Sequence, residues 1–275
     1  MLMTGLANRY AHQLIQAREA AEFIPSLSSR YPLTIGDAYE IAARVAEIRI
    51  AEGENIVGRK LDYFLETSSD RIGKKNRLPF WSWLFDSGVR FMENSEGDFS
   101  LRHTSAPFVE TEIIFRLGRL PPEGATIGQL AACIEWMAHG LEITEYPFRA
   151  ATRSLVDTIA GFGQHHALLV GEPKIVSEGS RKSLYAVMEG AGLSLACNNV
   201  IRTAGFGSSP CNNPLQGLLI LYQMLANMPE FSPLQVGDII ATGTWTKPLP
   251  IQPGEVWQTA VSGLPLSGLT VAFTA

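Results

Sequence analysis

The sequence contains few cysteines and no excess of basic residues. Only Cys133, Cys197 and Cys211 occur among 275 residues. An odd number of cysteines, in a chain long enough to bury a core without cross-links, indicates free thiols and a reducing compartment, so we expect a cytoplasmic protein. The net charge of -5 provides no basic face of the kind that nucleic acids require, and we therefore expect no nucleic-acid partner.

A long hydrophobic segment is also missing. The longest apolar run, from about Leu215 to Met228, contains Gln216 and Gln223 and is too short to span a bilayer. The first nine residues lack a basic segment followed by an apolar one, which predicts no signal peptide and no membrane partner. Lysine and arginine are scattered, apart from a cluster between residues 71 and 77 that we interpret as a solvated loop.

The pattern of apolar residues predicts an α+β fold. Helical spacing over residues 4–22, and from Thr34 to Gly53, predicts two N-terminal helices and a helical subdomain of residues 1–55. Residues 62–87 lack a clear period and are interpreted as irregular. Strand signals dominate after residue 106, interrupted by helices near residues 126–138 and 213–227. We expect residues 56–275 to form a β-rich domain built on a mixed, curved sheet.

One predicted strand carries two carboxylates on the same face. Side chains alternate along a strand, so Glu110 and Glu112 point to one side while their apolar neighbours point to the other. Such a pattern most often means a solvated acidic face. If the apolar side is buried, however, both carboxylates point into one small volume, where a hard divalent cation would neutralise them. A further acidic position, at Glu142 or Glu145, ends another predicted strand.

Four segments together resemble the fumarylacetoacetate-hydrolase-fold superfamily. The similarity is strongest to the group of 2-oxopent-4-enoate hydratases and 4-oxalocrotonate decarboxylases, and it implies a curved mixed β-roll with N-terminal helices. The segments are Gly58-Arg-Lys60, Glu110-Thr-Glu112, Leu141-Glu142-Ile-Thr-Glu145 and Gly237-Asp-Ile-Ile-Ala-Thr-Gly243. The resemblance implies Mg²⁺ or Mn²⁺ bound by Glu110, Glu112 and Glu142, with Glu145 as an alternative third ligand.

The same resemblance implies a lyase that acts on a small 2-oxo or 2-hydroxydienoic acid in aromatic degradation. Lys60 would face the substrate, and Thr242 and Thr244 would hold its carboxylate. In the aromatic segment of residues 79–85, which is either core or a lid, Trp81 is a predicted substrate contact.

One departure from the group concerns the acid/base residue. Hydratases of this group commonly carry Pro-Asp-Phe-Gly after the lysine, whereas this chain has Pro79-Phe80-Trp81-Ser82. The acid/base would then be another residue, and the candidates are Glu145, Asp86 and His165.

Several functions remain open from the sequence. A 2-oxopent-4-enoate-type hydratase is the main hypothesis, and a 4-oxalocrotonate-type decarboxylase is the first alternative. An acylpyruvate C–C hydrolase would use His165 or His166 to activate water. A non-catalytic subunit paired with an active homologue is the third alternative. We expect a homo-oligomer or a complex with a homologous pathway enzyme.

Overall fold

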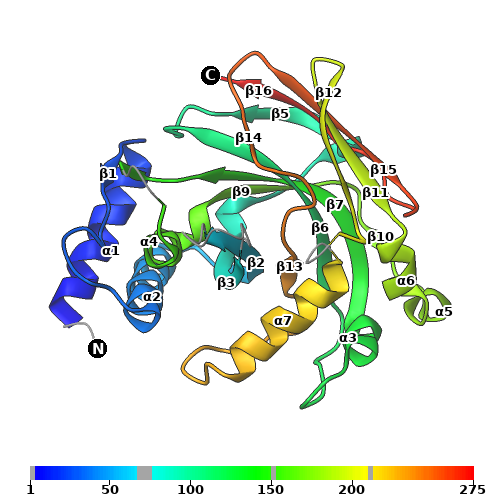
Figure 1. The fold of residues 1–275 in the computed structure, drawn as a ribbon, viewed down its shortest axis with the longest axis horizontal. Coiled ribbons are helices and arrows are strands. Elements are labelled where there is room, and N and C mark those ends of the chain that lie inside the picture. Colours follow the sequence, from blue (N-terminus) through cyan, green and yellow to red (C-terminus); the bar gives the residue numbers. More distant parts are fainter. Residues whose placement is uncertain (1–3, 67–75, 150–152, 210–212) are drawn as a thin grey trace, which may run out of the picture.

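The computed structural model describes residues 4–66, 76–149, 153–209 and 213–275, which form two large β-sheets and a two-stranded one, flanked by helices (Figure 1). The helices are α1 (Thr4–Glu19), α2 (Ile35–Ala51), α3 (Ile127–Cys133), α4 (Leu155–Ala160), α5 (Glu178–Arg181), α6 (Leu184–Glu189) and α7 (Pro214–Ala226). Short 3₁₀ turns are η1 (Asp86–Gly88), η2 (Glu93–Ser95) and η3 (Phe162–Gln164).

The larger sheet has nine strands in the order β3-β2-β13-β6-β7-β9-β4, with β10 beside β7 and β14 beside β6. Its strands are β2 (Ile56–Glu66), β3 (Asn76–Phe85), β4 (Val89–Phe91), β6 (Pro107–Leu117), β7 (Ile134–Glu145), β9 (His165–Val170), β10 (Lys174–Ile175), β13 (Ile239–Ala241) and β14 (Leu249–Pro250). The sheet curls, since the side chain of Lys60 on β2 reaches that of Glu142 on β7, three strands away, at 2.6 Å. The predicted curved, mixed sheet is confirmed.

A five-stranded sheet covers the outer face of the larger one. Its strands are β5 (Glu96–Ser100), β11 (Gly192–Cys197), β12 (Val200–Phe206), β15 (Val256–Ser262) and β16 (Thr270–Thr274). Val109 of β6 and Leu141 of β7 pack in one cluster with Trp257 and Val271 from this second sheet. Because these outward residues are fixed in an apolar layer, the alternate residues of β6 and β7 must point inward.

The N-terminal helices share a hydrophobic core with the large sheet. Tyr39 of α2 stacks on Trp81 of β3, with ring centroids 5.1 Å apart. The two-residue strands β1 (Ile24–Pro25) and β8 (Phe148–Arg149) pair in parallel and join the same regions. A domain boundary at residue 55 stays a prediction.

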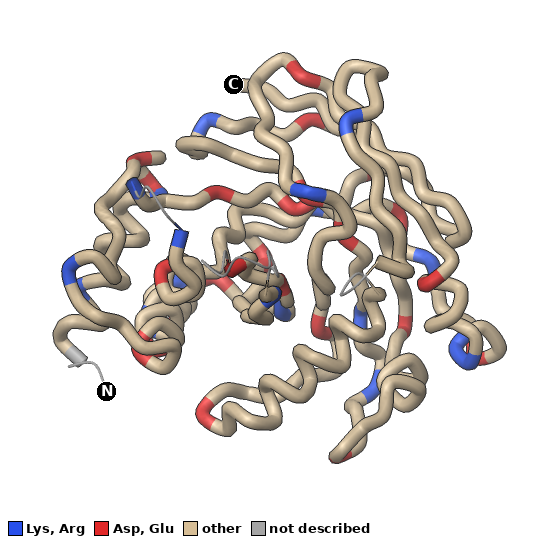
Figure 2. Tube along the Cα trace, viewed as in Figure 1, with Lys and Arg blue, Asp and Glu red and all other residues tan. Residues whose placement is uncertain are grey.

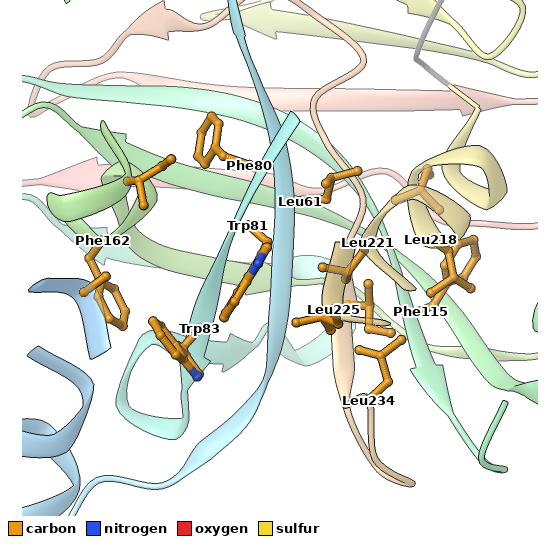
Figure 3. Close-up of a cluster of buried hydrophobic side chains, with 14 of the residues drawn as sticks. Leu61, Phe80, Trp81, Trp83, Phe115, Phe162, Leu218, Leu221, Leu225 and Leu234 are labelled. Carbon is orange, nitrogen blue, oxygen red and sulfur yellow. The ribbon is translucent and has the colours of Figure 1, made fainter. Parts of the chain in front are cut away.

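Helix α7 packs against β2 and β6. Figure 3 shows Leu218 and Leu221 of the helix beside Phe115 of β6. The start predicted for this helix is confirmed, since Asn213 caps it and Pro214 is in its first turn. The helix predicted to begin at Thr34 is confirmed as well, because Thr34 and Asp37 form a reciprocal capping box at the start of α2.

Two elements differ from the sequence-based expectations. The described parts of residues 62–87 are largely regular, because β2 continues to Glu66 and β3 runs from Asn76 to Phe85, while residues 67–75 lie outside the described residues. Strand β3 is buried on both faces over most of its length and therefore shows no polar alternation. The helix expected at residues 126–138 ends at Cys133, and Ile134–Ala138 pair with β6 as part of β7.

Lysine and arginine are scattered over the described part of the chain rather than gathered on one side (Figure 2). In the same part, no helix is both long and apolar enough to cross a bilayer. Residues 71–75 of the basic cluster, and Cys211, lie outside the described residues.

Gly58 is predicted to be required for the pairing of β2 with β13. A Cβ atom at this position would lie 1.8 Å from the carbonyl oxygen of Ile239, the residue that pairs with it. We expect Gly58→Ala to lower the free energy of unfolding by about 2 kcal/mol or more, because the backbone must move. Urea unfolding followed by circular dichroism measures this change.

A matched control is Gly128→Ala in α3, where an added Cβ would meet no atom within 4 Å. There we expect a gain of up to about 1 kcal/mol, since alanine favours a helix over glycine. Equal effects of the two substitutions would contradict the prediction for Gly58.

Candidate metal centre

Three glutamates converge inside the curled sheet. The antiparallel register of β6 and β7 places Glu110 directly opposite Glu142, and Glu112 follows two residues along the same face. One carboxylate oxygen from each lies within 4.8 Å of the others. All three side chains are buried, with 4%, 0% and 0% of their surface exposed for Glu110, Glu112 and Glu142. The alternative of a solvated acidic face is thus not what the structure shows.

Neighbouring groups satisfy only part of these carboxylates. The hydroxyl of Thr144 donates to Glu110 Oε1 at 3.1 Å, and the backbone N–H of Thr242 donates to Glu112 Oε2 at 3.1 Å. Within the described residues, Glu110 Oε2 and Glu112 Oε1 have no hydrogen-bond partner although both are buried. Buried oxygens without partners are costly, and a cluster of them fits a hard divalent cation, which prefers oxygen ligands.

The carboxyl groups oppose one another electrostatically. Burial, and then the charges of Asp62 and Glu142, raise the pKa of Glu110 to about 8. Burial, and then Glu142, raise the pKa of Glu112 well above its ordinary value. Burial alone would raise the pKa of Glu142 too, but Lys60 and His165 lower it overall. Glu142 is therefore the glutamate of the three that ionises most readily.

Lys60 lies at the centre of this network. Its Nζ donates to Glu142 Oε1 and Oε2 at 2.6 and 2.8 Å and to the carbonyl oxygen of Gly163 at 3.1 Å. Burial alone would lower the pKa of Lys60, but Glu142, Asp62 and Glu110 raise it above its ordinary value. The side chain is completely buried and carries its proton.

The carbonyl of Gly163 is presented by an unusual turn. Phe162, Gly163 and Gln164 have φ angles of 61°, 63° and 62°, which is the left-handed region. Phe162 stacks on Trp83 with ring centroids 5.9 Å apart, and the guanidinium of Arg49 lies 5.3 Å from its ring. Packing from β3 and α2 therefore holds a conformation that side-chain-bearing residues rarely adopt.

His165 positions Glu142. Burial lowers the pKa of His165 to about 4, so the ring is neutral, and its Nδ1–H donates to Glu142 Oε1 at 2.7 Å. A histidine held in this way orients a neighbouring ligand. His166 points elsewhere, toward Glu145, as expected for adjacent residues of a strand.

The structure does not bring Glu145 or Asp86 to the cluster. Glu145 lies three residues after Glu142 on β7, accepts from the backbone N–H of Ser105 at 3.0 Å, and borders a separate cavity of about 290 Å³ beside α1 and α2. Asp86 is exposed and accepts hydrogen bonds from Asn55. Neither of these two carboxyl groups faces the cluster of Glu110, Glu112 and Glu142.

A larger cavity of about 540 Å³ opens beside the glutamates and is lined by Asp62, Glu110 and Thr244, among others. This volume lies in the range of small-molecule sites.

Asp62 was missed in the sequence, although Lys60-x-Asp62 on β2 repeats the alternation of Glu110-x-Glu112. Its Oδ2 lies 3.7 Å from Lys60 Nζ, and burial raises its pKa.

The two threonines occupy different positions. Thr242 is 3% exposed and its hydroxyl donates to the carbonyl of Ile113, so it supports β6 and Glu112. Thr244 lines the cavity, and its hydroxyl donates to the carbonyl of Thr246 at 2.8 Å. Only the second of the two lies where a bound molecule would touch it.

Trp81 requires a correction. It is 1% exposed and packs against Tyr39, with the guanidinium of Arg59 5.5 Å from its ring. Figure 3 shows Trp81 and Trp83 on one side of β3 and Phe80 on the other. Phe80, not Trp81, lines the cavity, because Trp81 pairs with Leu61 on the core face while Phe80 pairs with Asp62.

A profile of the fumarylacetoacetate (FAA) hydrolase C-terminal family matches residues 93–271, which include all three glutamates. The chain belongs to this family. The resemblance inferred from the four sequence segments is thereby confirmed, although Lys60 and Asp62 precede the matched region.

Individual relatives extend the family match to most of the chain. The chain is 26% identical over 256 residues to the 2-keto-4-pentenoate hydratase of Paraburkholderia xenovorans, covering 92% of this chain and 90% of the relative. It is 26% identical over 256 residues to the 2-oxo-hept-4-ene-1,7-dioate hydratase of Escherichia coli, covering 90% and 91%. The structure of 4-oxalocrotonate decarboxylase from Pseudomonas putida, complexed with magnesium and adipate, matches with a TM-score of 0.83 at 19% identity and covers 99% of both chains.

The raised pKa of Glu110 predicts that the metal-free protein loses stability as the pH rises. The folded protein keeps this proton up to about pH 8, whereas an unfolded chain releases it near 4.5. The stabilisation that comes from this bound proton is therefore complete at a pH below the pKa of Glu110 in the unfolded chain. It is lost as the pH rises through the pKa of Glu110 in the folded protein. We expect the Tm in EDTA to fall between about pH 4.5 and 8, and Mg²⁺ to raise the Tm more at the higher pH.

Differential scanning fluorimetry measures both effects. The exposed Glu123→Gln serves as the control and should retain them, whereas Glu110→Gln should lose most of the Mg²⁺ response. A Mg²⁺ response that is equal in all three proteins would show that the cation binds elsewhere.

Proposed function

We propose that this chain is a divalent-metal-dependent lyase, a hydratase of the 2-oxopent-4-enoate type that acts on small 2-oxo or 2-hydroxydienoic acids of aromatic degradation. The observation that carries the proposal is the set of buried glutamates whose unpaired oxygens lie beside Lys60 and a cavity. Relatives named as hydratases, aligned over about nine-tenths of the chain, support it.

Glu110, Glu112 and Glu142 would hold Mg²⁺ or Mn²⁺, as their carboxylate oxygens suit hard cations. When bound, the cation would act as a Lewis acid on the 2-oxo group of the substrate. Lys60 keeps its proton and adds a second positive charge, so we assign it the electrostatic stabilisation of the enolate oxygen. His165 holds Glu142 in place through its Nδ1–H.

Asp62 is our candidate for proton transfer. Hydration of a 2-hydroxydienoate requires a proton at C5, loss of the enol proton, and addition of water across C3 and C4. Asp62 borders the cavity, lies beside Lys60 and has a raised pKa, so it suits a group that both accepts and donates a proton. Glu145 and Asp86 face away, and the Nδ1–H of His165 is engaged by Glu142.

A decarboxylase is the second candidate, and Phe80 favours it. Phe80 pairs with Asp62 across β2 and β3 and lines the cavity, where an apolar side chain suits departure of neutral CO₂. The C–C hydrolase hypothesis has less support, because the His166–Glu145 pair lies at the other cavity. The presence of Asp62 also weighs against a non-catalytic subunit.

We further propose that the protein acts in the cytoplasm as a homo-oligomer or with a homologous pathway enzyme. Cys133 and Cys197 are buried free thiols, which suits a reducing compartment.

Strand β12 lies at the edge of its sheet and exposes Ile201 and Phe206, which suits a protein interface. Light scattering of the purified chain measures its molar mass, and a monomer would contradict the homo-oligomer.

We expect the chain with Mg²⁺ to consume 2-hydroxypenta-2,4-dienoate, measured by loss of its ultraviolet absorbance. CO₂ release from 4-oxalocrotonate, measured in parallel, distinguishes hydration from decarboxylation. Glu112→Gln should reduce turnover by about 100-fold or more and weaken Mg²⁺ binding in calorimetry, because a ligand charge is lost.

Glu123→Gln, on the surface, is the matched control and should behave as the wild type. Undiminished turnover in EDTA, or in Glu112→Gln, would contradict a metal-dependent reaction.

Asp62→Asn should lower kcat by about 100-fold or more, since an amide cannot transfer the proton. Mg²⁺ affinity should change little, because Asp62 lies outside the group of three candidate ligands. Asp86→Asn tests the discarded candidate and should leave kcat unchanged. A kcat that falls in Asp86→Asn but not in Asp62→Asn would reverse the assignment.

A further inference from the structure

The cavity beside the glutamates is acidic at its inner end and basic at its outer end. Asp62 and Glu110 lie on its inner wall. Arg77, Arg153 and Lys247 line the same cavity, and all three are exposed. They come from three separate segments, namely the start of β3, the residues before α4 and the connection between β13 and β14. We call these three residues the cationic rim.

Within the residues that the structure describes, no carboxylate forms an ion pair with Arg153 or Lys247. Arg153 packs over the rings of Tyr146 and Phe108, at 5.0 and 5.6 Å, and donates one hydrogen bond to Gln164 Oε1 at 3.4 Å. A guanidinium has five N–H donors, so most of those on Arg153 remain available to a ligand.

The segment that carries Lys247 is well fixed. The backbone N–H of Trp245 donates to the carbonyl of Thr111 on β6 at 3.0 Å, and the hydroxyls of Thr111 and Thr246 lie 3.1 Å apart. Lys247 therefore follows two residues that are anchored to the strand of Glu110 and Glu112. Its position relative to the glutamates is set by the sheet.

The charges at the inner end of the cavity are balanced without the cationic rim. Lys60 and a divalent cation would balance the three glutamates. A 2-oxo monoacid has a single carboxylate, which binds at that inner end together with the 2-oxo group. The rim would then face the apolar tail of such a substrate, which has no acceptor for the N–H groups of the rim.

Resting on the proposed function, we propose that the cationic rim binds a second carboxylate at the far end of the substrate. The chain would then prefer 2-oxo-dioates to 2-oxo monoacids. Sequence similarity does not decide between these classes, since the relatives named for pentenoate and for heptenedioate are both 26% identical to this chain. Charge-assisted hydrogen bonds from Arg153 and Lys247 to the second carboxylate favour the dioate over the monoacid.

The test compares two ligands that differ only at their far end. 2-Oxohexanedioate and 2-oxohexanoate have the same backbone length and no carbon–carbon double bond to hydrate, so calorimetry in Mg²⁺ measures binding alone. We expect the wild-type protein to bind the dioate about tenfold or more tightly than the monoacid. Raising the salt concentration to about 0.5 M should narrow this preference, because ion pairs at an exposed rim are screened.

Two substitutions locate the effect. Lys247→Met and Arg153→Met should each weaken dioate binding by about tenfold and leave monoacid binding unchanged, which also shows that each variant is folded. Lys182→Met, at the end of α5, is the matched surface control and should leave both affinities unchanged.

Equal binding of the two acids by the wild-type protein would overturn the rim proposal and leave the lyase proposal intact. The same holds if Lys247→Met and Arg153→Met weaken both acids equally. Binding of neither acid in Mg²⁺ would overturn both proposals.

Discussion

The site depends on the burial of like charges that the fold cannot separate. The pairing of β6 with β7 places Glu110 opposite Glu142, and the apolar layer between the two sheets prevents either strand from rotating its carboxylates outward. Lys60 compensates part of this charge, mainly at Glu142. The negative charge that Lys60 does not compensate raises the pKa of Glu110 and Glu112, and it makes the site suited to bind a cation.

The sequence predicted the fold correctly where an element buries one face in apolar residues and carries polar residues on the other. The alternation around Glu110 and Glu112 was readable because their neighbours Val109, Thr111 and Ile113 are completely buried. The helix caps at Thr34 and Asn213 were readable because a cap depends on adjacent residues only. The family resemblance added Glu142 and Lys60, which lie far apart in the sequence and are brought together by sheet pairing that no local pattern encodes.

The parts that did not follow have equally specific causes. Trp81 was misplaced because β3 carries large apolar side chains on both faces, so its composition does not distinguish the core side from the cavity side. Asp62 was overlooked because it is the first of residues 62–87, which lack a clear period and were expected to be irregular, whereas β2 continues to Glu66. Residues 134–138 resemble the helix that precedes them, and their pairing with β6 overrides that local preference.

The left-handed turn at residues 162–164 connects the N-terminal helices to Lys60. Its carbonyl at Gly163 is one of the acceptors that hold Lys60, and its conformation is kept by Phe162 between Trp83 and Arg49 of α2. The helices that precede the β-rich region in the sequence thus support the lysine to which we assign a role in the proposed reaction. A shortened chain that began at β2 would keep every proposed ligand yet lose the support that aims its central ammonium group.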